Sequence, residues 1–232
     1  MISDWSVILL SLRVSLVATA LVVPVGLVVA WVLVRKRMPG LFILDLLVSL
    51  PLAVTPVVIG YALLSVFGQR SPVGRFLEDT LGVSVAFTWL GAVLASAILA
   101  FPLAVRAYMV AISGVDTRLE SAARSLGARP LRVFATITLP LAYRGILAGT
   151  LLAFVRALSE FGATIMIAGN IPGQTQTIPL AIFSRISAGR DGAALQLVVV
   201  AVVLAALSIL VHNYLVGRVR TGESAGEARG PR

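Results

Sequence analysis

Five long apolar stretches constrain the fold of this chain more than any other feature of its sequence. They cover about residues 7–34, 42–67, 86–112, 141–168 and 193–216. A hydrocarbon core about 30 Å thick needs roughly 20 apolar residues per helix, so each stretch can cross a membrane as a tilted helix. The stretches are continuous, unlike the alternation of a barrel strand, and a backbone in lipid must satisfy its own hydrogen bonds. The sequence therefore predicts an all-α integral membrane protein with five transmembrane helices.

The composition agrees with this class and leaves little room for another domain. Of the 232 residues, 59% are apolar and 12% are charged, which is far from the balance of a water-soluble domain. We predict one transmembrane domain, residues 1–216, and a polar, glycine-containing tail, residues 217–232, that is disordered. Residues 1–5 contain an acid where a signal peptide would have basic residues, so we expect them to remain in the mature protein.

The basic residues are divided unequally between the ends of the stretches. One side has ten: Arg35, Lys36, Arg37, Arg118, Arg124, Arg129, Arg132, Arg144, Arg218 and Arg220. The other side has four: Arg70, Arg75, Arg185 and Arg190. Because cytoplasmic loops carry an excess of Lys and Arg, we predict a multi-pass protein of the cytoplasmic (inner) membrane, with its N-terminus outside and its C-terminus cytoplasmic. The net charge of +9 then reflects membrane topology, and we expect no nucleic acid partner.

Residue types suited to catalysis or metal binding are scarce. The chain has no Cys and a single histidine, His212, so it lacks the residues for a thiolate or histidine metal site. It also lacks the G-x-x-x-x-G-K-[ST] pattern of a phosphate-binding loop. We therefore expect no catalytic residue, bound cofactor or metal ion, and we disfavour an intramembrane enzyme. A secondary transporter is the less favoured alternative, because Glu160 and Asp45 are acidic residues within apolar stretches.

The long cytoplasmic loop, residues 113–140, has the pattern of two short helices. Thr117 and Glu120 have the spacing of a capping box, which starts a helix. Gly127 is placed to end that helix as a left-handed cap. Pro130 suits the first turn of a second helix, which we expect to run to about residue 136. The first helix is amphipathic, so it either rests on lipid headgroups or docks on a soluble partner, and the pattern alone leaves both open.

Part of this loop resembles the signature of ABC importer permeases. Ala122-Ala123-Arg124-Ser125-Leu126-Gly127, followed after nine residues by Ile137-Thr138-Leu139-Pro140, is similar to that signature, E-A-A, three residues, G, nine residues, I-x-L-P. In that family the loop forms coupling helices that sit in a cleft of the ATP-binding subunit. Ser121 stands at the Glu position, so an acidic contact with the ATPase is expected to be shifted to Glu120 or lost. The resemblance implies that these residues couple to the ATPase: Glu120, Ser121, Ala122, Ala123, Gly127, Ile137, Leu139 and Pro140.

A second block resembles the molybdate branch of the family. Residues 156–164 read R-A-L-S-E-F-G-A-T, residues 168–173 read A-G-N-I-P-G, and residues 175–182 read T-Q-T-I-P-L-A-I. The usual branch pattern has Gly where this chain has Ser159. Sulfate and tungstate permeases share the E-F-G-A core, so tungstate and sulfate or thiosulfate are alternative substrates. The external loop residues that the resemblance picks out are Asn170, Pro172, Gly173, Thr175 and Thr177.

The resemblance also implies partners. It predicts an ABC type I importer permease fold, a homodimer in the lipid bilayer, separate ATPase subunits that hold ATP and Mg, and an extracytoplasmic oxyanion-binding protein. One five-helix chain encloses too little to form a gated path alone, which also favours two copies.

Candidate pore residues lie where the apolar stretches are interrupted. Pro51 and Pro56 interrupt the second stretch, and such breaks are tolerated where they face protein or a water-filled path. Arg156 and Glu160 are four residues apart and can pair within the membrane, either as a gate or as a structural ion pair. The full set of gate or pore candidates is Pro51, Thr55, Pro56, Gly60, Arg156, Glu160, Phe161 and Gly162.

Overall fold

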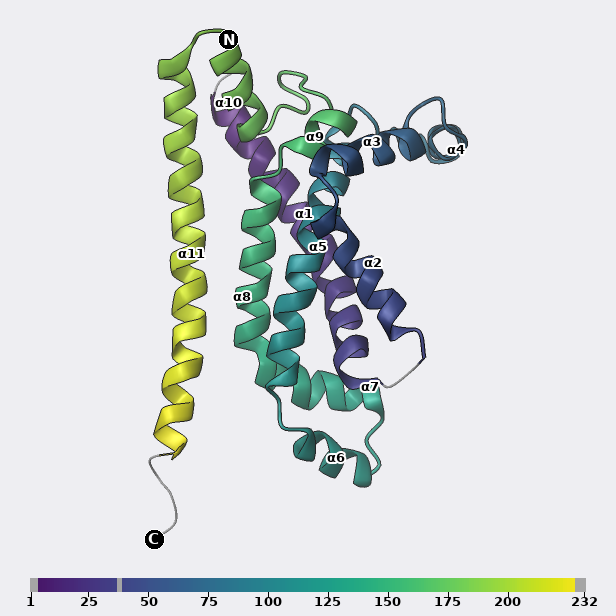
Figure 1. Cartoon of the computed structure of the whole chain (residues 1–232), viewed down its shortest axis with the longest axis vertical. Helices are drawn as coiled ribbons and strands as arrows, with labels where there is room; N and C mark the ends of the chain where they lie inside the picture. Colours follow the sequence, from purple (N-terminus) through teal and green to yellow (C-terminus); the bar gives the residue numbers. More distant parts are fainter. Residues whose placement is uncertain (1–3, 37–38, 228–232) are drawn as a thin grey trace.

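The computed structural model describes the backbone of residues 4–36 and 39–227 and the side chains of these residues as far as Tyr214. Every regular element in this part of the chain is a helix. The four longest run along the long axis of the molecule (Figure 1): α1 (Asp4–Arg35), α5 (Trp89–Ser113), α8 (Leu139–Leu158) and α11 (Asp191–Glu227). The shorter elements are α2 (Leu41–Ala53), α3 (Pro56–Phe67), α4 (Pro72–Leu81), α6 (Thr117–Ser125), α7 (Pro130–Val133), the π-helical turn η1 (Phe134–Thr138), α9 (Gly162–Ile167) and α10 (Ile178–Ser187).

Helix α5 lies at the centre and packs against both α1 and α8. Small residues allow this close approach: an added Cβ on Gly149 would lie 2.7 Å from the Cβ of Ala107, and one on Gly145 would lie 2.6 Å from that of Ala111. Such small-residue contacts are typical of helix pairs in membranes, where dispersion contacts replace the hydrophobic effect. Helix α11 lies at the edge of the bundle, against α8 and α10.

Within the described residues, four helices are long and apolar enough to span a membrane, or five spans are present if a bent pair counts as one. The bent pair is α2 and α3, which meet at an angle of 111°. The prediction of one helix over residues 42–67 is therefore wrong in detail. Pro56 restricts the preceding residue to an extended backbone, and Thr55 has φ −64° and ψ 142°. Figure 1 shows α2 rising along the bundle and α3 turning across its end.

The predicted stretch 141–168 is also broken. It forms α8 and the short α9, which are separated by Ser159, Glu160 and Phe161. The Glu160 carboxylate accepts a hydrogen bond from the backbone amide of Ala163 at 2.8 Å, so it satisfies a free amide at the start of α9. The break is thus stabilised by a side chain that a hydropathy profile counts only as a charge.

The last helix is longer than the predicted stretch 193–216. Helix α11 continues to Glu227 through most of the region that we expected to be a disordered tail, and residues 228–232 lie outside the described part. Extending an existing helix adds a hydrogen bond for each residue without a new nucleation step, and the chain has no proline between α11's start and residue 227.

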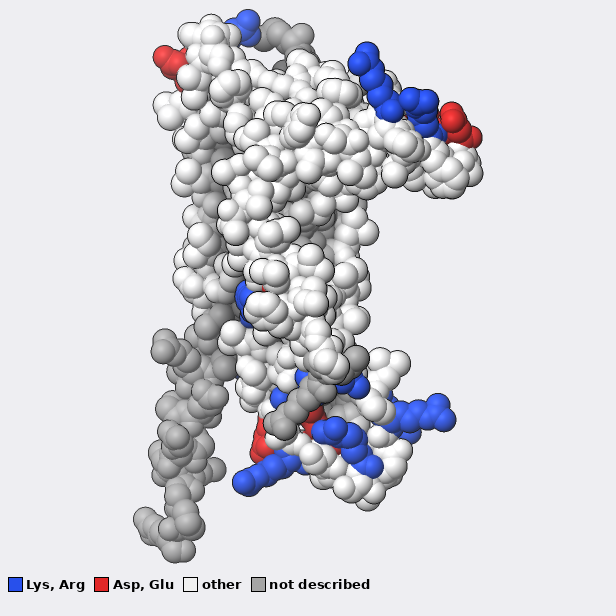
Figure 2. Space-filling model, turned by 45° about the vertical axis from the view of Figure 1, so that its right-hand side comes forward, with Lys and Arg blue, Asp and Glu red and all other residues white. Residues whose placement is uncertain are grey.

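Charged side chains gather at the two ends of the molecule, and the surface between them is nearly free of charge (Figure 2). Large apolar side chains are exposed along the helices, among them Leu47 of α2 and Leu207 of α11, each more than half exposed. An uncharged, apolar belt between two charged ends is the surface expected of a protein that crosses a bilayer.

Candidate functional site

The helical bracket, α6 and α7 with the turn between them, lies at one end of the bundle, beyond the ends of α1 and α5 (Figure 1). Helix α6 begins one residue earlier than a capping box would place it. Asp116 is the N-cap, and its carboxylate accepts a hydrogen bond from the Arg118 amide at 2.8 Å. The predicted capping box of Thr117 and Glu120 is therefore wrong, because the Asp116 carboxylate takes the capping position one residue earlier.

Gly127 ends α6 as predicted. Its φ of +85° lies in the left-handed region, and an added Cβ would meet nothing within 4 Å. The second short helix begins at Pro130 as predicted, but it does not end before the next span. It runs through the π-helical turn η1 directly into α8, so Pro140 lies inside a continuous helical segment that began at Pro130. The α7 half of the bracket is therefore continuous with the α8 span.

The tip of the bracket presents exposed leucines. Leu126 is 90% exposed, Leu131 74% and Leu119 50%. Exposed apolar side chains at the charged end of a membrane protein, away from the apolar belt, indicate a surface that another protein covers. Of the predicted coupling residues, Ser121, Ala122, Gly127 and Pro140 are exposed, and Ala123, Ile137 and Leu139 are partly buried.

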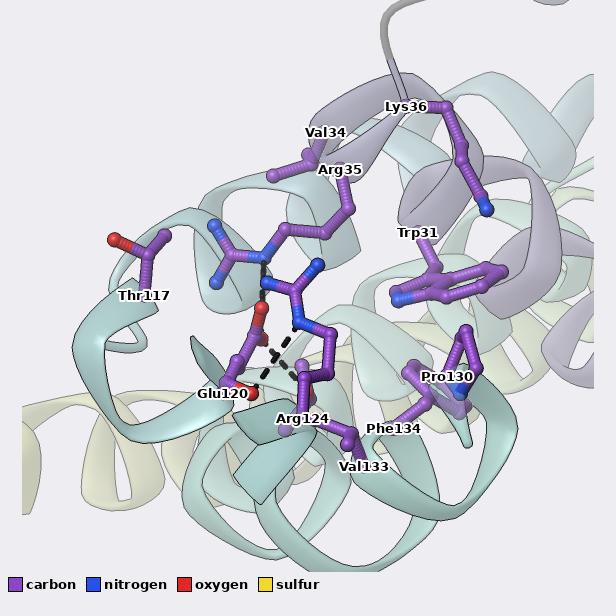
Figure 3. Close-up of a pocket in the computed structure, with 11 residues that line it drawn as sticks. Trp31, Val34, Arg35, Lys36, Thr117, Glu120, Arg124, Pro130, Val133 and Phe134 are labelled. Atoms are coloured by element: carbon purple, nitrogen blue, oxygen red, sulfur yellow. Dashed lines mark hydrogen bonds and ion pairs between the residues drawn. The ribbon is translucent and has the colours of Figure 1, made fainter. Parts of the chain in front are cut away.

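Glu120 differs from the rest of that set because it points inward. It is 4% exposed, and its carboxylate pairs with Arg35 at the end of α1 at 3.1 Å and accepts a hydrogen bond from the Thr138 hydroxyl at 2.7 Å (Figure 3). Of the two expected alternatives, an acidic contact with the ATPase shifted to Glu120 or lost, this geometry disfavours the shift to Glu120. The Glu120 carboxylate forms its contacts within the chain, and Ser121 is the exposed residue next to it.

Arg35, the partner of Glu120, makes further contacts at the end of α1. Its guanidinium also donates to the backbone oxygens of Ile112 and Val115, at 2.8 and 2.9 Å, where α5 ends. Sequence reasoning counted Arg35 only as a topology charge, because its partner Glu120 is 85 residues away and no spacing pattern connects them. The junction of Arg35, Glu120 and Thr138 thus joins α1, α5, α6 and η1.

The predicted pore residues fall on the two helix breaks, and the structure brings these breaks together. Helix α3 packs against α9: an added Cβ on Gly60 would lie 2.6 Å from the backbone oxygen of Ala163, and one on Gly162 would lie 3.0 Å from Pro56. Glycines are needed here because two backbones approach closely. The interrupted second stretch and the interrupted fourth stretch form one contact.

The predicted ion pair is present at this contact. Arg156 donates to Glu160 at 2.8 Å, and Glu160 is 3% exposed. Phe161 packs against Phe183 of α10, with ring centroids 5.4 Å apart. Thr55 is exposed beside the break, and Pro51 lies within α2.

The predicted external-loop residues form a compact network next to α10. Asn170 and Gln176 bond each other at 2.9 Å, and both contact the Ser184 hydroxyl. The Thr175 hydroxyl accepts from the Ile171 amide, which holds the turn that contains exposed Pro172 and Gly173, whose φ is +78°. Thr177 is buried as the N-cap of α10.

Comparison with known proteins identifies the family. A model described as the binding-protein-dependent transport system inner membrane component matches residues 22–221. The chain belongs to this family. It is a permease subunit of an ABC transporter and not an enzyme, and the resemblance seen in the bracket motif is confirmed. Membership of an importer family implies a separate ATPase and a binding protein as partners.

Several curated relatives of the permease are similar over most of its length. The molybdenum transport system permease protein ModB of Escherichia coli (strain K12) is 48% identical, over 94% of this chain and 97% of its own. ModB of Haemophilus influenzae is 44% identical, over 94% and 95%. The sulfate transport system permease protein CysT of Salmonella typhimurium is 40% identical, over 69% of this chain and 58% of its own.

Solved structures support the fold. The MetNI methionine ABC transporter has a TM-score of 0.63 and 17% identity, and the match covers 89% of this chain and 93% of that one. An amino acid ABC transporter gives 0.59 and 18%, over 93% and 92%. At this identity the likeness concerns the fold alone, and it confirms the predicted ABC importer permease fold.

Proposed function

We propose that this permease imports molybdate across the cytoplasmic membrane, driven by ATP hydrolysis in a separate subunit. The observation that supports molybdate as the substrate is the 48% identity to a molybdenum permease along nearly the whole of both chains. The similarity to sulfate permeases covers a smaller part of the chain and of the relative, so sulfate is the second candidate.

The working unit in this proposal is a homodimer with two ATPases. The exposed apolar side chains of α3 and α11 support a lipid-facing or self-associating surface, and a twofold axis would place two helix-break contacts around one path. Orientation follows the positive-inside rule: the end with the bracket is cytoplasmic, so the ATPases dock there and the network around Asn170 faces the binding protein.

Coupling then runs from the bracket into the spans. ATP binding closes the ATPases and moves the two brackets, and α7, η1 and α8 form one continuous segment that moves with them. This chain contributes a two-state element whose equilibrium the ATPases shift, and it supplies no group to hydrolysis. Tetrahedral dianions need only a weak path here, because the binding protein selects and delivers them.

The test is ATP hydrolysis by the complete transporter in lipid vesicles, loaded in turn with binding protein carrying molybdate, tungstate or sulfate. Molybdate is expected to give the largest stimulation. Leu126→Ser, which changes a 90% exposed side chain at the tip of the bracket, should abolish stimulation without unfolding the permease. Leu81→Ser, a 63% exposed leucine at the opposite end, is the matched control and should keep it.

Each outcome is informative. Stimulation by sulfate alone would keep the importer and overturn the substrate. Equal loss of ATPase stimulation in both leucine variants would show that the bracket takes no part in coupling. No stimulation by any of the three anions would refute the proposed function.

A further inference from the structure

A pocket lies between the end of α1 and the bracket (Figure 3). Its volume is about 250 Å³. The lining comes from the last turns of α1, from α6, and from α7 and η1. Leu119, Leu126 and Leu131 take no part in the lining, so the pocket is distinct from the surface proposed for the ATPase.

Three cations and one carboxylate line this pocket: Arg35, Lys36, Arg124 and Glu120. The carboxylate is already committed to Arg35 and to a hydroxyl in η1. The Arg124 side chain makes one hydrogen bond within the described part of the chain, from Nε to the Glu120 backbone oxygen at 3.3 Å. Figure 3 shows its guanidinium beside that of Arg35, on the pocket side. The terminal nitrogens of Arg124 thus remain as donors in a site with excess positive charge.

Lys36 and Trp31 supply the opposite wall from the end of α1. The Lys36 ammonium lies 5.2 Å from the centroid of the Trp31 ring, and Lys36 is exposed. Helix α1 ends as a candidate span at Arg35, so this wall lies at the level where an apolar span meets water. Tryptophan and lysine at that level are the usual anchors of the headgroup region.

We propose that this pocket binds the phosphate group of an anionic phospholipid. Arg124 and Lys36 donate to the phosphate oxygens, and the Trp31 ring packs against the apolar part of the headgroup region. Two guanidinium groups beside a single carboxylate repel one another, and a phosphate between Arg124 and Lys36 removes that excess charge. Basic pockets between helices at the cytoplasmic surface are suited to such headgroups.

A bound phosphate would connect α1 to α6 by a second link, next to the Arg35–Glu120 pair. Anionic lipid would therefore stiffen the contact between the bracket and the spans. This consequence for coupling depends on the proposed function, whereas lipid binding itself does not.

The experiment is native mass spectrometry of the full transporter complex, with phosphatidylglycerol and phosphatidylcholine added in equal amounts. Wild type is expected to retain phosphatidylglycerol in preference. Lys36→Gln/Arg124→Gln should weaken that retention roughly 30-fold, because two cationic contacts are lost. Arg118→Gln/Arg132→Gln is the matched control: it removes the same charge from exposed positions of the bracket outside the pocket, and it should retain the lipid.

A second arm identifies the source of the phosphate. Millimolar inorganic phosphate should not displace phosphatidylglycerol from wild type if the lipid is the ligand; displacement at that concentration would overturn the lipid assignment in favour of a free oxyanion. Equal retention by the two double variants would overturn the site altogether. Loss of the ATPase from Lys36→Gln/Arg124→Gln with unchanged lipid retention would assign the pocket to an acidic surface of the ATPase instead.

These results are distinguishable from failure of the proposed function. Lipid retention is read from mass and needs no substrate, so the pocket assignment stands or falls whichever anion the permease transports.

Discussion

Removing the Glu120 carboxylate should loosen the bracket more than any other single truncation of a charged side chain there. Glu120→Ala leaves the Arg35 guanidinium without its counter-charge and the Thr138 hydroxyl without its acceptor. Glu120 is buried and Arg35 is mostly buried, with side-chain exposures of 5% and 14%. An unpaired charge in such a place cannot be fully hydrated, so the native state loses stability.

The size of the destabilisation by Glu120→Ala depends on the hydrogen bonds that Arg35 keeps. Breaking a buried ion pair by removing one partner costs about 3–5 kcal/mol. Arg35 keeps its hydrogen bonds to the backbone oxygens of Ile112 and Val115, which solvate part of its charge. We therefore expect about 3 kcal/mol, at the lower end of that range. Glu120→Gln retains an acceptor for Thr138 and should cost less than Glu120→Ala.

The assay is a double-mutant cycle on the unfolding free energy of the permease in detergent. Arg35→Ala/Glu120→Ala should be less destabilising than the sum of the two single changes by about 2 kcal/mol, because the second change removes a charge that the first left unpaired. Glu78→Ala, an exposed carboxylate on α4, is the control and should change stability by less than about 0.5 kcal/mol. Additive single effects, or a Glu120→Ala cost equal to that of the control, would refute the junction.

Two further predictions concern the spans. Gly149→Ala should destabilise the permease by about 1–3 kcal/mol, because the new Cβ would lie 2.7 Å from that of Ala107, whereas Gly192→Ala, with open space at its Cβ, should be neutral or stabilising; thermal unfolding in detergent compares the two. Glu160→Gln removes the charge that Arg156 pairs with at 2.8 Å. Transport should fall several-fold if the pair is a gate, with unfolding temperature nearly unchanged, and a large drop in unfolding temperature instead would identify a structural pair.

The helical class, the apolar stretches and the bracket could be predicted because each depends on local sequence. Hydropathy over roughly 20 residues marks a span, and Gly127 and Pro130 mark the ends of short helices through their own backbone preferences. The sequence indicates the helix breaks in the second and fourth apolar stretches only in part. Pro56 indicates an interruption of the helix. The 111° angle between α2 and α3, however, depends on how α3 packs against α9, and no local sequence pattern encodes that packing.

Two of the errors concern carboxylates whose hydrogen-bond partners the sequence spacing does not reveal in full. Glu120 has the spacing of a capping residue, but its carboxylate pairs with an arginine 85 residues earlier in the chain. Glu160 was expected on the face of a continuous helix, and it instead caps the start of a new one. In a membrane protein a buried carboxylate gains most from the partner that neutralises it, so sequence spacing is a weak guide to its role.

The contacts of the Glu120 carboxylate also determine how the bracket responds when it is displaced. Because the Glu120 carboxylate holds both Arg35 of α1 and Thr138 of η1, and Arg35 also holds the end of α5, a displacement of α6 cannot be absorbed by the bracket alone. It must either break a buried ion pair, at a cost of about 3 kcal/mol or more, or carry three helices with it. In the proposed mechanism, an ATPase that pulls on the exposed leucines at the tip of the bracket therefore moves the spans, and the inward-turned Glu120 carboxylate transmits the force.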